Sequence, residues 1–238
     1  MTISMNTRTQ LICARCGLAF CLLALFPFVA AGLIPPVSEH LTAAQVVHHY
    51  AAHRTLIRLG LVIGLFLSGL LLPFFGVITV QLRRIERNNP VLAMTQLCAG
   101  AVTFMVVLLP LLVLLAAALR PDRAPQTTLA LNDLGWILLV VPVTSVIVQA
   151  LCIGFAVLGD NSEQPVFPRW VAHVCFLDVL LSLPAVLCVF FTTGPFAWQG
   201  AVTFYLPAVG VFGNWFVLSL VLPGAIRQES PDRALVAT

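Results

Sequence analysis

An aspartate lies within one of the long apolar segments of this sequence. Asp178 follows Trp170 by eight residues and is the only acidic residue well inside such a segment. In a helix this separation corresponds to about 12 Å of rise, which places the carboxyl near the middle of the hydrocarbon layer of a bilayer. An ionisable side chain is energetically costly at that depth, so Asp178 is a candidate functional residue.

Polar side chains occur at a comparable depth in four other apolar segments. They are Ser68, Thr103, Gln149 and Asn214. If they face inward together with Asp178, they form a small polar pocket that can bind a ligand. They can equally form hydrogen bonds between helices, each of which contributes roughly 1 kcal/mol to helix association. No arginine or lysine occurs at this depth, so we expect Asp178 either to be protonated or to lie beside water or a cation.

Histidines are concentrated just before the second apolar segment. His49 and His53 are four residues apart, which on a helix separates them by only about 40° and allows them to hold a transition metal. The histidines can instead form a proton-sensing surface, because histidine titrates near neutral pH. They can also belong to a solvated interfacial helix without a special role. A further metal ligand could come from His48, His40, Glu39, Asp122 or Asp133.

The residues around these histidines define where their helix begins and limit its chemistry. Thr42 and Gln45 form a capping-box pattern, which predicts a helix that starts at about residue 43 and runs on into the second apolar segment. The string from His49 to His53 contains no glutamate, so the general base of the zinc-protease motif is absent.

Transmembrane helices must position these residues. Of the 238 residues, 60% are hydrophobic and only 9% are charged, whereas about a quarter of a soluble domain is charged. Six apolar runs have the roughly 20 residues needed to cross hydrocarbon. The sequence therefore predicts an all-α, polytopic membrane protein with a six-helix bundle in one domain, and an outer interfacial helix ahead of span two. The expected spans are about 14–34, 57–80, 92–119, 134–158, 170–193 and 200–225.

Prolines inside the spans predict that the helices are bent, because proline removes one intrahelical hydrogen bond and clashes with the preceding turn. Membrane helices tolerate such kinks when neighbouring groups satisfy the freed carbonyl. Before span four, Asn132 and Asp133 predict an N-cap for a helix starting at Leu134. The interior prolines are Pro27, Pro73, Pro110, Pro142, Pro184 and Pro207.

Arginines predict the orientation, because short cytoplasmic loops carry an excess of positive residues. An arrangement with both termini in the cytoplasm puts eight arginines inside and four outside, and we expect the inner membrane of a bacterium. The run Gln81–Arg87 is the strongest anchor, and it can also dock anionic lipid or a partner. The first span, followed by Val29-Ala30-Ala31, also fits a cleaved signal peptide, which would leave five spans.

Three classes of function fit these observations. The first is binding or passage of a small, lipophilic or weakly charged solute around Asp178 and Gln149. The second is an accessory subunit of a larger membrane complex, which fits the short loops. The third is a metal-dependent membrane enzyme that uses His49, His53 and His48. The sequence contains no glycine-rich phosphate loop and no nucleophile elbow, and its net charge of +3 does not indicate a nucleic-acid partner.

Overall fold

The computed structural model describes residues 5–38, 40–120 and 122–236, and the side chains of residues 6–38, 40–120 and 122–229. The described residues form helices and no strand. Six helical segments are long and apolar enough to cross a membrane, which confirms the all-α, polytopic prediction. These segments are Asn6–Ala30, Arg54–Glu86, Val91–Leu119, Pro125–Gly159, Trp170–Val189 and Gly194–Glu229.

Most spans are built from more than one helix. The first three spans and the outer helix comprise α1 (Met5–Leu23), α2 (Leu25–Ala30), α3 (Ala43–Ala52), α4 (Arg54–Ser68), α5 (Leu71–Glu86) and α6 (Val91–Leu119). The last three comprise α7 (Pro125–Val140), α8 (Thr144–Gly159), α9 (Trp170–Ser182), the 3₁₀ turns η1 (Leu183–Val189) and η2 (Gly194–Phe196), the π-helical turn η3 (Ala201–Tyr205) and α10 (Leu206–Val236).

The interior prolines account for these interruptions. Pro27 lies four residues after the end of α1 at Leu23, and Pro73 lies four residues after Gly69, where α4 gives way to α5. A proline ring clashes with the carbonyl four residues earlier, so the breaks fall where the clash is expected. Pro142 lies in the gap between α7 and α8, whereas Pro110 lies inside the continuous helix α6. The predicted proline kinks are therefore present as breaks in most spans.

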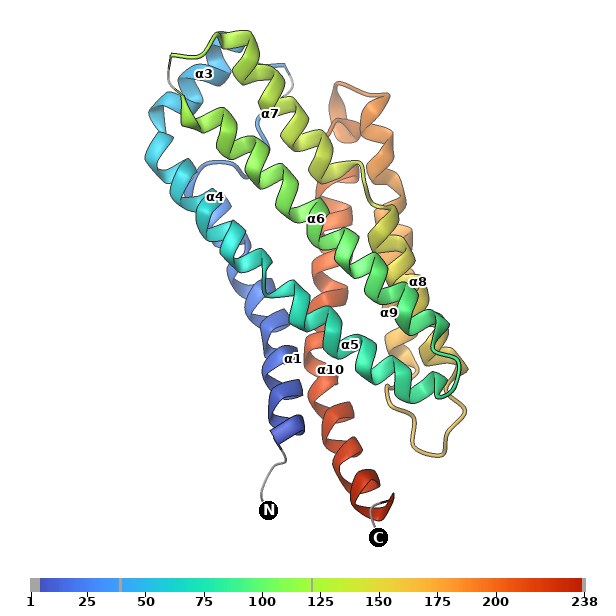
Figure 1. The fold of residues 1–238 in the computed structure, drawn as a ribbon. Coiled ribbons are helices and arrows are strands. Elements are labelled where there is room, and N and C mark those ends of the chain that lie inside the picture. Colours follow the sequence, from blue (N-terminus) through green and yellow to red (C-terminus); the bar gives the residue numbers. More distant parts are fainter. Residues whose placement is uncertain (1–4, 39, 121, 237–238) are drawn as a thin grey trace.

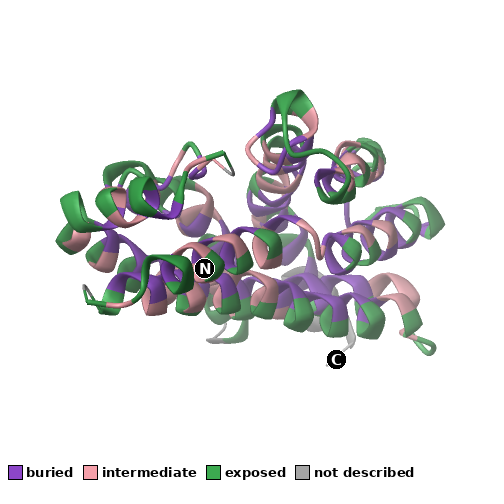
Figure 2. Ribbon diagram, turned by 90° about the horizontal axis from the view of Figure 1, so that it is seen from above, coloured by how far each residue is buried: buried purple, intermediate pink, exposed green. Residues whose placement is uncertain are grey.

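The long helix α6 organises the bundle. It packs against α4 and α5 on one side and against α7 and α8 on the other, while α9 lies between α8 and α10. The first span, α1, packs against α10, and both termini lie at the same end of the molecule (Figure 1). Exposed residues cover the outside of the helices and buried residues face neighbouring helices (Figure 2). Side chains such as Phe66 and Phe190, which are 80% and 76% exposed, fit contact with lipid.

A buried polar network joins three helices at the end that carries the termini. The Gln10 side-chain amide of α1 donates to the Glu229 carboxylate of α10 at 3.0 Å. The Gln81 amide of α5 donates to Gln10 Oε1 at 2.6 Å and to Glu229 at 3.3 Å. Because these groups satisfy one another, the first and last spans are fixed against α5 in a defined register.

The C-terminal end of α6 is capped by two arginines of α4 and by one from the loop that follows α6. Arg54 donates to the Leu119 carbonyl at 2.8 Å, and Arg58 donates to the carbonyls of Ala118, at 3.1 Å, and Leu119. Arg123 donates to the Ala116 carbonyl at 2.9 Å. The last carbonyls of a helix have no partner within it, so these arginines satisfy groups that would otherwise need water.

The outer helix follows the sequence pattern at its start and departs from it at its end. Thr42 and Gln45 form the predicted capping box at the start of α3. The prediction that this helix runs unbroken into span two is wrong, because the backbone turns at His53 before α4 begins. The prediction of an N-cap at Asn132 is also wrong. The helix α7 starts at Pro125, and Asn132 is buried within it and accepts a hydrogen bond from Tyr50 at 3.1 Å.

Candidate functional site

An apolar cavity of about 390 Å³ lies within the bundle. Its walls come from α1 and α2, from the middle of α6, from the end of α7 and the start of α8, and from η3 and the first turns of α10, with Gly64 of α4 completing them. This volume is in the range of pockets that bind small molecules. Almost every lining side chain is aliphatic or aromatic, so the cavity suits an apolar ligand.

Helix interruptions shape the cavity. Leu25 lies just after the break between α1 and α2, Pro142 and Val143 occupy the break between α7 and α8, and Pro207 follows the π-turn η3; all four line the cavity. An unbroken helix would fill such space with its regular ladder of side chains. The breaks imposed by proline therefore leave room between the spans.

Two threonine hydroxyls in the cavity wall are already paired, whereas one buried indole N–H there has no partner. Thr103 Oγ1 donates to Ser145 Oγ at 3.1 Å, and the Thr203 hydroxyl donates to the Ala197 carbonyl. Trp136 is 1% exposed, and none of the described residues accepts a hydrogen bond from its indole N–H. A buried donor without a partner is costly, so a ligand that accepts this hydrogen bond would gain affinity.

Asp178 lies at the contact between α9 and α10. The Asn214 side-chain amide donates to Asp178 Oδ2 at 2.8 Å, and the Ser182 hydroxyl donates to Oδ1 at 3.2 Å. Asn214 in turn accepts a hydrogen bond from the Cys175 thiol at 3.5 Å. A Cβ atom at Gly210 would lie 3.1 Å from Asp178 Oδ1, so the glycine allows the two helices to approach closely. The structure thus brings Asp178 and Asn214 together, as predicted for a shared polar layer.

The other members of the predicted polar layer lie elsewhere in the bundle. Gln149 is buried on α8, where its amide nitrogen lies 2.8 Å from the position that a Cβ at Gly100 would take, and no described residue accepts a hydrogen bond from that nitrogen. Ser68 donates to the Leu65 carbonyl of its own helix at 2.7 Å. Thr103 is the member of the layer that lines the apolar cavity. Ser68, Thr103 and Gln149 therefore lie outside the contact that joins Asp178 to Asn214.

The predicted histidine pair is close together in space. The rings of His49 and His53 are 5.2 Å apart between centroids, while His48 is exposed. Among the residues that the structure describes, no three histidine, cysteine, aspartate or glutamate side chains are grouped so that they could hold a metal ion. Glu39, a proposed third ligand, lies outside the described residues. Burial, with His53 nearby, lowers the pKa of His49 below its ordinary value.

The apolar cavity is the feature that the sequence did not reveal. Its walls come from residues as far apart as Phe20 and Trp215, most of them ordinary core types. The only local signal was the proline in each span, which indicated bending without showing which bends face a common space.

The comparisons add no relatives, since no protein-family model, no curated protein and no solved structure matches this chain.

Proposed function

We propose that this chain binds a small lipophilic molecule in the apolar cavity between its membrane spans. The observation that carries the proposal is the pairing of an apolar cavity of about 390 Å³ with one unpaired buried donor, the Trp136 indole N–H. The ligand class is a molecule with an apolar body and an oxygen acceptor such as a ketone, ester or ether. Such a molecule also passes between the membrane and the cavity in this proposed function.

Asp178 has a positioning role in this proposal. It is hydrogen-bonded to Asn214 on α10, the helix whose first turns form one wall of the cavity. We place the protein in the inner membrane of a bacterium, with both termini in the cytoplasm and the bilayer as its surroundings. The arginine bias of the loops and the location of both termini at one end support this orientation.

The first test uses a probe matched to the cavity. A brominated medium-chain methyl ketone quenches nearby tryptophans, and Trp136 and Trp215 both line the cavity. We expect saturable quenching of the purified protein that exceeds quenching by the brominated alkane of the same length. Trp136→Phe should remove this preference for the ketone, a loss of about two- to ten-fold in affinity, since one uncharged hydrogen bond contributes about 0.5–1.5 kcal/mol.

A pair of matched substitutions locates the probe. Ala208→Trp places a large ring at the cavity wall and should abolish saturable quenching, whereas Ala101→Trp, on the lipid-facing side of α6, should leave it unchanged. Equal quenching in both variants would show that the probe dissolves in the surrounding detergent or lipid, and would refute the proposal.

Native mass spectrometry of protein extracted gently from its own membrane tests the same proposal without a chosen probe. We expect one chain with a retained small molecule, whose mass gives the ligand class. A complex that contains a second polypeptide and no small molecule would instead support an accessory subunit of a larger membrane assembly. A mass that includes a transition metal would support the histidine-based enzyme.

A further inference from the structure

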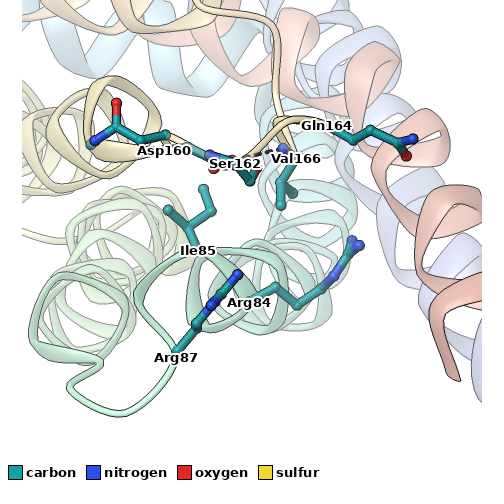
Figure 3. A pocket seen from close by; sticks show the side chains of 9 residues that line it. Arg84, Ile85, Arg87, Asp160, Ser162, Gln164 and Val166 are labelled. Atoms are coloured by element: carbon teal, nitrogen blue, oxygen red, sulfur yellow. Dashed lines mark hydrogen bonds between the residues drawn. The ribbon is translucent and has the colours of Figure 1, made fainter. Parts of the chain in front are cut away.

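A second cavity, of about 410 Å³, lies at the end of the bundle that carries both termini. It is open and polar, whereas the cavity between the spans is apolar. Its walls are the last turn of α5 and the segment that follows α8. In Figure 3, Arg84 and Arg87 lie on one side of it, and Asp160 and Ser162 lie on the other.

Both carboxylate oxygens of Asp160 accept hydrogen bonds from groups in the same loop. Its Oδ1 accepts hydrogen bonds from the Ser162 backbone N–H at 3.1 Å and from the Ser162 hydroxyl at 2.6 Å, and its Oδ2 accepts from the Val166 N–H at 2.8 Å. Burial raises the pKa of Asp160, but these hydrogen bonds and then the charge of Arg84 outweigh it and lower the pKa overall. Asp160 is therefore ionised at neutral pH and shapes the loop around the pocket.

The other carboxylate at this end of α5 is occupied as well. Glu86 accepts hydrogen bonds from the backbone N–H groups of Leu92, at 2.9 Å, and Ala93, at 2.7 Å, and so caps the start of α6. Neither Glu86 nor Asp160 has a hydrogen bond to Arg87.

Arg84 contributes a positive charge from a fixed position. One nitrogen of its guanidinium donates to Gln81 Oε1 at 2.7 Å and to the Ala225 carbonyl of α10 at 2.8 Å. These contacts hold the side chain against the pocket wall, where it lies near Asp160 and offsets the charge of that carboxylate. The charge that remains uncompensated in the pocket is that of Arg87.

Arg87 combines an unpaired side chain with a rare backbone conformation. Within residues 6–38, 40–120 and 122–229, no side chain or carbonyl forms a hydrogen bond or ion pair with its guanidinium. The φ of Arg87 is +56°, a value that residues other than glycine and asparagine rarely adopt. Arg87 follows the last residue of α5 and lies at the mouth of the pocket. Glycine would form this turn without strain, whereas arginine here carries a cost in backbone free energy. Such strained positions are typical of functional sites.

We propose that this pocket binds a phosphate group, with the Arg87 guanidinium as its main ligand and Arg84 as a fixed second charge. Arginine pairs with two phosphate oxygens at once, and the pocket offers the side-chain amides of Asn161 and Gln164 as further donors in its wall. The phosphate group in this pocket can come from the headgroup of an anionic phospholipid or from a soluble phosphate ester.

The test uses the full-length protein and two matched charge removals. Arg87→Gln removes the proposed ligand, and Arg83→Gln removes an exposed arginine of the same helix that does not line the pocket. The lipid probe is phosphatidylglycerol in phosphatidylcholine nanodiscs, read by the lipid retained in native mass spectra. The soluble probe is glycerol 3-phosphate in detergent, read by the shift in melting temperature.

We expect Arg87→Gln to weaken binding of one probe by about ten- to a hundred-fold and Arg83→Gln to weaken it by less than about three-fold. Retention of phosphatidylglycerol would identify a lipid headgroup as the source, and a shift with glycerol 3-phosphate alone would identify a soluble ester. Equal weakening by both variants would show a diffuse attraction of basic residues, and no binding of either probe would leave no site; either result overturns the proposal.

Arg87→Gly gives an independent readout. It removes the guanidinium and relieves the backbone, so we expect it to weaken phosphate binding as much as Arg87→Gln does, while the melting temperature in the absence of phosphate stays equal or rises. A fall in melting temperature without phosphate would mean that the arginine serves the fold, and would overturn the assignment.

Discussion

The Asn214 amide donates a 2.8 Å hydrogen bond to the Asp178 carboxyl, and this contact joins the last two spans inside the membrane. Both side chains are almost fully buried, at 2% and 1% exposure. The carboxyl also accepts a hydrogen bond from Ser182, so it is satisfied within α9 and α10. An intramembrane carboxyl therefore acts here as part of the contact between α9 and α10.

Removing both partners of this contact should cost less than the sum of the two single removals. We expect Asn214→Leu to lower the free energy of unfolding by about 1–3 kcal/mol, because it leaves the Asp178 carboxyl short of a donor, whereas the double variant Asp178→Leu/Asn214→Leu should cost less than the sum of the single changes. Reversible unfolding in mixed micelles measures these values. Ser219→Ala, which loses a bond only to the Trp215 carbonyl of its own helix, is the control and should cost less than about 1 kcal/mol. Strict additivity would contradict the coupling.

Two glycines of the second span should respond in opposite ways to alanine. A Cβ at Gly60 would lie 2.5 Å from the Pro27 carbonyl oxygen, a backbone atom that cannot move without shifting α2. We expect Gly60→Ala to lower the free energy of unfolding by about 2 kcal/mol or more through this overpacking. No described atom lies within 4 Å of a Cβ at Gly76, so Gly76→Ala should stabilise the helix by up to about 1 kcal/mol. Thermal unfolding of the two variants in one detergent decides the matter.

Acidification should destabilise the protein through His49. Its pKa is lowered in the folded state, so the unfolded chain binds a proton at a higher pH than the folded one, and stability falls as the pH drops below about 6.5. We expect His49→Gln to reduce the loss of melting temperature between about pH 7 and pH 5. His40→Gln, at an exposed position that does not perturb His49, should leave the loss as in the wild type. If the two variants behave alike, His49 does not carry the effect.

The arginine cap of α6 should protect the C-terminal end of that helix. Arg58→Gln removes donors from the carbonyls of Ala118 and Leu119, so we expect faster hydrogen exchange in the last turns of α6 and a loss of about 1 kcal/mol in stability. Arg120 is exposed and directly follows the last residue of α6, so Arg120→Gln should have little effect on exchange or stability. Unchanged exchange in Arg58→Gln would mean that water satisfies these carbonyls equally well.

The shared level of Asp178 and Asn214 along the bundle could be predicted from the sequence, but the direction of a side chain around its helix could not. Counting residues placed Asp178 and Asn214 in one layer, and they do meet. Gln149 was counted into the same layer, yet it lies beside Gly100 of α6, because the rotation of each helix depends on packing that hydropathy does not encode. The six spans follow from composition and length, which are properties of local sequence.

The outer end of the bundle shows a second limit. Arg54 and Arg58 were interpreted as markers of orientation, and the structure adds that both donate to carbonyls about 60 residues further along the chain. No local pattern indicates such a partner, because the free carbonyls of α6 become visible only once α4 lies beside them. The capping box at Thr42, by contrast, needs only three neighbouring residues and was predicted correctly.

The packing of α1 against α10 also sets an order for assembly during synthesis. Gln10 emerges from the ribosome long before Glu229, its partner 219 residues later, and until then its amide has no carboxylate to bind. The first span therefore gains its contacts with α10 only after the sixth span has been made. A chain halted before α10 would keep the bond between Gln81 and Gln10 but would lack the carboxylate that both amides share in the finished bundle.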